Sequence, residues 1–139
     1  MRAVRLKTAE DYDQDFVVEA FRTAYAEVPN TDADHVRRTM GAAHSMVDTY
    51  VATDSSALLI MRPPTDMLSK TAVAISFYAK GKEARELFVR IALDLMDAYG
   101  ATSVQAVEHS LRTDAYMRVF SKLADVVPTG VIYTFKRKS

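Results

Sequence analysis

The stretch from residue 71 to residue 100 decides the fold class, and it reads TAVAISFYAKGKEARELFVRIALDLMDAYG. Residues 71–78 have bulky apolar side chains on one face and small ones on the other, which predicts a strand buried on both faces. Apolar residues then recur every three or four positions over 83–99, which predicts a long amphipathic helix. Gly100 follows this helix, and glycine commonly ends helices because it adopts the left-handed conformation readily. A strand, a tight turn and a helix therefore form the central unit.

The neighbouring segments predict a mixed sheet. Residues 102–107 form a further strand candidate after the helix, and strand–helix–strand connections of this kind join parallel strands by a right-handed crossover. Upstream, residues 47–53 and 57–61 are strand candidates separated by Asp54-Ser55-Ser56, which is typical of an antiparallel hairpin. Both kinds of pairing in one chain indicate an α/β fold, with a mixed β-sheet and helices on both faces.

The N-terminal part predicts one strand and two helices. Residues 3–6 form a short strand candidate, and Thr8 with Asp11 has the spacing of a capping box at the start of a helix. We expect that helix to run to about Ala26. Thr31 or Asp32 then begins a second helix, in which a glycine weakens the helical pattern.

The C-terminal part predicts a last helix and a last strand. Residues 113–123 carry an apolar stripe at helical spacing, and residues 131–136 follow a turn at Pro128-Thr129-Gly130. The expected order of elements is β-α-α-β-β-β-α-β-α-β. We expect residues 1–139 to form a single domain of this α/β type.

The composition excludes several kinds of protein. The 139 residues include 18 Lys plus Arg and 18 Asp plus Glu, so the bulk charge indicates neither nucleic acid nor an anionic membrane as partner. The absence of cysteine excludes disulfides, thiol catalysis and zinc–thiolate sites. His35 and His44 lie nine residues apart, a spacing that does not put them on one face of a helix, so we expect no metal site. No apolar run is long enough for a membrane span or a signal peptide, and we expect a cytoplasmic protein.

Four stretches resemble the GNAT acyltransferases, the Gcn5-related N-acetyltransferases. These stretches are residues 4–11, 74–87, 95–101 and 114–123. The resemblance spans nearly the whole chain and implies a GNAT-like fold with acetyl-CoA as cosubstrate. It also implies that the pyrophosphate binds at the turn after the central strand. The pantetheine arm would lie where two neighbouring parallel strands, here 71–78 and 102–107, splay apart.

The turn after the central strand is chemically suited to a pyrophosphate. Where a helix begins, unpaired amides and the positive end of the helix dipole face outward together. The residues expected at this cosubstrate site are Phe77, Tyr78, Lys80, Gly81, Lys82, Glu83, Ala84 and Arg85. Lys80, Lys82 and Arg85 could add positive charge for the phosphates. The alternative is a strand-to-helix turn that binds no ligand.

Two positions depart from the pattern of the GNAT family. The family's phosphate-binding motif has Gln or Arg, two residues, Gly, one residue, and then Gly or Ala. With its central glycine on Gly81, the chain has Tyr78 and Glu83 at the outer positions, and the Glu83 carboxylate would lie near the phosphates. In the last helix, alignment of Lys122-Leu123 with the family's ending puts Phe120 where many members have a tyrosine that acts as general acid.

Glu108 and Tyr116 are the candidate catalytic residues. Acetylation of an amine needs a base to take the ammonium proton, and Glu108 follows residues 102–107 with His109 beside it. The alternative for this pair is a solvent-exposed loop. Tyr116 lies one turn before Phe120, so it could protonate a leaving thiolate only in a rotated or shifted helix. Its alternative role is packing.

Two functions are compatible with these patterns. The first is an acetyl-CoA-dependent N-acyltransferase that transfers the acyl group directly to an amine of a small molecule or a protein. The second is a catalytically degenerate GNAT-fold structural or assembly protein, because fold does not fix function. Length, element order and the stretch around Gly81 resemble a small GNAT-like protein of bacteriophage virions, which implies a virion or an infected host cell. Residues 131–136 are the expected contact edge of a homo-oligomer, by analogy with the family.

Overall fold

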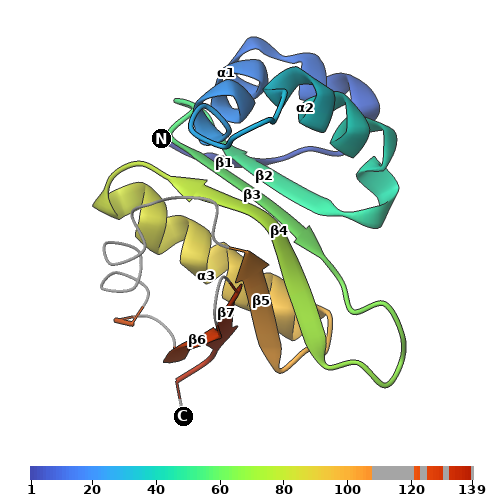
Figure 1. Ribbon diagram of the computed structural model, residues 1–139, viewed down its shortest axis with the longest axis vertical. Coiled ribbons are helices and arrows are strands. Elements are labelled where there is room, and N and C mark those ends of the chain that lie inside the picture. The colour runs from blue at the N-terminus through green and yellow to red at the C-terminus, as the bar shows by residue number, and fades with distance from the viewer. Residues whose placement is uncertain (108–120, 123–124, 130–131, 139) are drawn as a thin grey trace.

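The computed structural model describes residues 1–107, 121–122, 125–129 and 132–138 (Figure 1). Its helices and strands are β1 (Ala3–Arg5), the 3-10 helix η1 (Ala9–Asp13), α1 (Asp15–Ala24), α2 (Ala33–Ala42), the 3-10 helix η2 (His44–Met46), β2 (Asp48–Ala52), β3 (Ala57–Arg62), β4 (Thr71–Ala79), α3 (Lys82–Ala98), β5 (Ser103–Val107), β6 (Asp125–Thr129) and β7 (Ile132–Lys136). No helix in the described ranges is long and apolar enough to cross a membrane.

The described strands form one mixed sheet of seven strands in the order β1-β2-β3-β4-β5-β7-β6. β4 and β5 are parallel and are joined through α3, whereas the other neighbouring pairs are antiparallel. The helices α1 and α2 cover one face of the sheet, and α3 lies against the other (Figure 1). The predicted mixed sheet with helices on both faces is confirmed.

The strand β3 contributes side chains to both hydrophobic cores, one on each face of the sheet. Leu58 and Ile60 face α1 and α2, while Leu59 and Met61 face α3, and all four side chains are fully buried. Burial of each such side chain stabilises the fold by about 1.5–3 kcal/mol. The centre of the sheet is therefore well buried, and the next strand, β4, leads to the start of α3.

The end of α3 has the geometry that its sequence predicts. Gly100 has φ +69°, its N–H donates to the Asp97 carbonyl at 3.0 Å, and the Ala101 N–H donates to the Met96 carbonyl at 3.0 Å. These two hydrogen bonds make a Schellman motif with glycine at the left-handed position. They fix the direction in which the chain leaves α3 towards β5.

The N-terminal helix differs from the prediction. The capping box is present, since the Asp11 N–H donates to Thr8 Oγ1 at 3.3 Å and the Thr8 N–H donates to Asp11 Oδ2 at 3.1 Å. The backbone N–H groups of Lys7 and Thr8 hold the pKa of Asp11 below its usual range. However, the box begins a 3-10 helix, and extended Gln14 separates that helix from α1.

The single helix expected over residues 8–26 is therefore wrong. The buried Tyr12 hydroxyl donates to Thr49 Oγ1 at 2.8 Å on β2. This tertiary contact anchors the short η1 segment to the sheet, and a break at Gln14 lets α1 set off in its own direction. Tertiary contacts of this kind override a weak local propensity.

The C-terminal part differs from the prediction in two ways. Residues Asp125–Thr129 form the strand β6, although a turn was expected at Pro128. A proline is tolerated there because β6 is the outermost strand of the sheet. β7 lies between β5 and β6, so both of its edges are paired and it cannot be the expected contact edge. Of the predicted helix 113–123, only residues 121–122 are described, and they form a turn.

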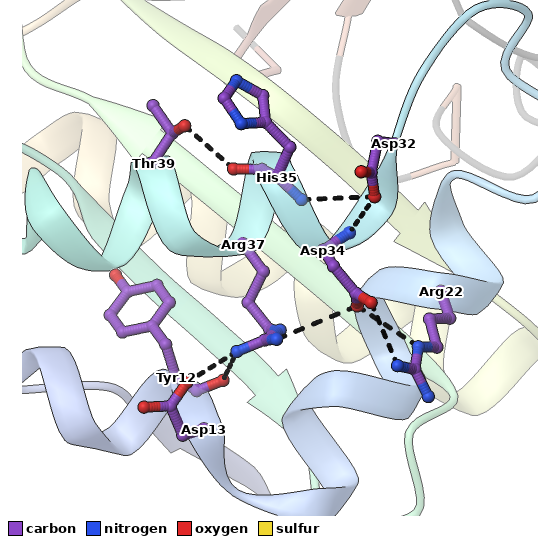
Figure 2. Close-up of polar contacts among 8 residues, drawn as sticks. All are labelled: Tyr12, Asp13, Arg22, Asp32, Asp34, His35, Arg37 and Thr39. Atoms are coloured by element: carbon purple, nitrogen blue, oxygen red, sulfur yellow. Dashed lines mark hydrogen bonds and ion pairs between the residues drawn. The ribbon is translucent and has the colours of Figure 1, made fainter.

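Arg37 holds the N-terminal segment against α2 (Figure 2). It is only 7% exposed, and its Nη1 donates to the Tyr12 carbonyl at 3.2 Å and to Asp13 Oδ1 at 2.6 Å. Its Nη2 also lies 3.8 Å from Oδ1 of Asp34. Asp34 in turn accepts two hydrogen bonds from Arg22 on α1, and that guanidinium holds the pKa of Asp34 below its usual range. These contacts join η1, α1 and α2 into one layer.

Arg37→Ala should lower the free energy of unfolding by about 1.5–3 kcal/mol, the usual contribution of hydrogen bonds to a charged group. Its neighbour Arg38 is exposed, so Arg38→Ala is the matched control and should change stability by no more than about 0.5 kcal/mol. Urea denaturation measures both. Equal stability of the two variants would contradict the structural role assigned to Arg37.

Candidate functional site

The parallel strands β4 and β5 are paired over only part of their length. Their register begins at Thr71 with Ser103 and ends at Ala74 with Ala106. β5 continues to Val107, which pairs with β7, whereas β4 continues to Ala79 and stays paired with β3. The described β4–β5 ladder thus ends at Ala74 and Ala106, and β4 continues for five more residues beyond it (Figure 1).

A β-bulge marks the point of separation. On β3, Met61 pairs with Ala74 and the preceding Ile60 pairs with Ser76, so Ile75 is an extra residue on β4. A bulge bends its strand and increases the local twist. Because it follows directly on the last pair shared with β5, it accounts for the divergence of β4.

The turn after β4 leaves the first amides of α3 without protein acceptors. The Lys80 N–H donates to the Ser56 carbonyl at 2.7 Å, and the Arg85 N–H makes the first helical bond, to the Gly81 carbonyl at 3.1 Å. In the described part of the chain, no protein acceptor is found for the N–H groups of residues 81–84, and no side chain caps the helix. Unpaired donors at a helix start attract anions.

Gly81 is required at the start of α3 by its backbone conformation. Its φ of +95° and ψ of 155° lie in a region that is essentially restricted to glycine. A β-carbon at this position would meet no atom within 4 Å, so the constraint is conformational and the surface beside the amides is open. The predicted tight turn at Gly81 is confirmed.

The charged residues of the turn differ in their surroundings. The Nε of Arg85 is buried and lacks a hydrogen-bond partner, which is costly for a charged side chain. Lys82 lies 3.9 Å from Glu86 in an exposed ion pair of small energetic value. Lys80 and Glu83 are exposed, and Glu83 is the acidic residue of the first turn. Arg85 is therefore the cation of this turn best placed to gain from a bound anion.

The remaining described site residues belong to the two hydrophobic cores. Phe77 and Ala84 pack on the α3 side of the sheet, and Tyr78 packs on the opposite side. The candidate catalytic residues Glu108 and Tyr116 lie outside the described residues, so their roles stay predictions.

An apolar pocket adjoins the point of strand separation, and the sequence reasoning missed it. It lies between α3 and the two parallel strands, and its lining residues are Ala74, Phe77, Val89, Ala92, Leu93, Val104 and Ala106. Small side chains on facing elements were the only signal in the sequence. No group of three or more acidic or histidine residues suited to a metal ion occurs among the described residues.

Solved structures similar to this chain include several acetyltransferases. A probable acetyltransferase from Staphylococcus epidermidis has a TM-score of 0.65 and 11% identity, covering 96% of each chain. The PaiA N-acetyltransferase of Thermoplasma acidophilum, solved with coenzyme A, has a TM-score of 0.56 and 13% identity over 100% of each chain. The chain has the GNAT fold.

A third GNAT-fold structure, an aminoglycoside 6'-acetyltransferase of type Ii, has a TM-score of 0.68 and 11% identity, covering 99% of this chain and 97% of the other. No family model matches the sequence, and no curated protein matches it either. At such low identity the likeness establishes the fold and leaves the activity to be argued from the site.

Gly81→Ala and Gly81→Asn should each destabilise the protein by about 1–3 kcal/mol, because neither residue adopts the backbone conformation of Gly81 readily. Gly100 serves as the comparison, since asparagine is tolerated at a left-handed helix end. Gly100→Asn should therefore cost less than Gly100→Ala. Denaturant unfolding tests both pairs, and a Gly81→Ala variant as stable as the parent would refute the assigned conformation.

Proposed function

We propose that the protein is an acetyl-CoA-dependent N-acyltransferase that transfers the acyl group directly to an amine. Two neighbouring features together support this proposal. The amides of residues 81–84 have no protein acceptors in the described chain, and the described ladder between β4 and β5 ends at Ala74. A GNAT-fold N-acetyltransferase that covers the whole chain was solved with coenzyme A, which supports the same ligand class here.

The start of α3 fits a pyrophosphate group. The amides of residues 81–84 donate to its oxygens, and the positive end of the helix dipole favours its charge. The Arg85 guanidinium gains a partner for its buried Nε, while the side chains of Lys80 and Lys82 add positive charge. The Glu83 carboxylate opposes binding, so we expect weaker affinity than a glycine or alanine there would allow.

The gap between β4 and β5 fits the pantetheine arm and the thioester. Acetyl-CoA supplies the acyl group in activated form. Holding both reactants in this gap makes the transfer effectively unimolecular. The predicted base Glu108 would take the proton of the amine, and the predicted acid Tyr116 would protonate the thiolate.

The second candidate is a GNAT-fold protein that has lost catalysis and serves in assembly, for example in a bacteriophage virion. Two observations favour it. Glu83 places a carboxylate beside the phosphate position, and the loop between β3 and β4 exposes Met67 and Leu68, whose exposed fractions are 94% and 91%. Exposed apolar side chains are a common feature of contact surfaces.

Acetyl-CoA binding separates the two candidates. Acetyl-CoA at about 100 times its dissociation constant should stabilise the acyltransferase by about 2.7 kcal/mol, which thermal unfolding detects readily. Arg85→Met should reduce this stabilisation, yet leave the ligand-free protein at least as stable as the parent, because it removes an unpaired buried polar atom.

Arg90→Met is the matched control, since Arg90 is exposed on the same helix and lies farther from its start. This variant should keep the stabilisation by acetyl-CoA. Unchanged unfolding of the parent at millimolar acetyl-CoA would reject the acyltransferase and favour the assembly protein. If acetyl-CoA stabilises Arg85→Met as much as Arg90→Met, the phosphates do not contact Arg85.

A further inference from the structure

The apolar pocket beside the candidate site lies against the last pair shared by β4 and β5. That pair is Ala74 with Ala106, and both residues line the pocket. Phe77, the next lining residue on β4, lies three residues beyond that pair. A group held in the gap between the strands is thus next to the pocket.

The pocket exists because its walls carry small side chains. Ala74, Ala92 and Ala106 come from three different elements and converge on it. The surrounding core is close-packed, as fully buried Phe88 and Leu59 indicate. The volume open to the centre of a water-sized group is about 20 Å³, and one such group needs about 10–15 Å³, so the pocket has room for one or two of them. A methylene or methyl group has a similar size.

We propose that the pocket receives the end of an acyl chain longer than acetyl. This inference rests on the proposed acyltransferase function and names its donor as a short aliphatic acyl-CoA, of propionyl to butyryl length. An acetyl group held in the gap would end at Ala74 and Ala106, whereas one or two further carbons would enter the pocket. The space for one or two water-sized groups limits the useful chain to that length.

The chemistry of the lining also defines which acyl groups are excluded. The lining side chains are all apolar, from Ala74 on β4 to Leu93 on α3. A succinyl or malonyl group would bury a carboxylate without a hydrogen-bond partner, which is strongly unfavourable. The pocket therefore selects for apolar acyl chains and against acidic ones.

Isothermal titration with a series of thioesters tests this inference on the intact chain. Affinity should rise about fourfold for each methylene added from acetyl-CoA to propionyl-CoA and butyryl-CoA. It should rise no further for hexanoyl-CoA, and succinyl-CoA should bind more weakly than butyryl-CoA. The series needs no variant, so it does not depend on any substitution being tolerated.

Ala92→Leu fills the pocket from α3 and should abolish the gain from chain length while leaving acetyl-CoA affinity within about twofold, since it touches no amide of the helix start. Ala92→Val is the smaller substitution if the first variant does not fold. Ala98→Leu, at an exposed position near the end of α3, is the matched control and should keep the gain.

The possible failures are distinguishable. Binding of acetyl-CoA with equal or weaker binding of propionyl-CoA and butyryl-CoA would overturn the acyl-chain inference and leave the proposed acyltransferase standing. A chain-length gain that persists in a folded Ala92 variant would show that the pocket does not hold the chain. Failure of every CoA thioester to bind would overturn both proposals.

Discussion

The extra residue in β4, Ile75, is the constraint on which the candidate site depends. It ends the register with β5 at Ala74 while the other edge of β4 stays bonded to β3 as far as Ala79. β4 is thus paired with β3, which contributes to a core on each face, whereas its described pairing with β5 covers only Thr71–Ala74. Without the bulge the parallel ladder could extend further and close the gap.

The start of α3 leaves polar groups without protein partners, and these groups are available to a ligand. The amides at residues 81–84 and the Nε of Arg85 lack protein partners in the described chain, and each such group is costly where water cannot reach it. The backbone conformation of Gly81 is one that any other residue would adopt only with strain. Because most of the candidate binding groups belong to the backbone, the geometry does not require the GNAT side chains at the positions of Tyr78 and Glu83.

The elements that could be predicted from sequence are those with local causes. The length of α3, its end at Gly100, the hairpin of β2 and β3 and the capping box at Thr8 all follow from periodicity or from turn chemistry. The break at Gln14, the strand β6 around Pro128 and the bulge at Ile75 depend on tertiary contacts or on partner strands, which leave no local pattern. The turn at Gly81 was predictable, whereas the burial of Arg85 and the pocket behind Ala74 required the three-dimensional structure.

Amide chemical shifts show whether the open amides of α3 bind the pyrophosphate of a CoA thioester. In a ¹H–¹⁵N correlation spectrum titrated with coenzyme A, we expect the largest shifts at residues 81–84. The amide of Gly100, at the opposite end of the same helix, should stay unchanged. If the amides of residues 81–84 do not shift, or if the shifted amides cluster at another surface, coenzyme A does not bind at the start of α3.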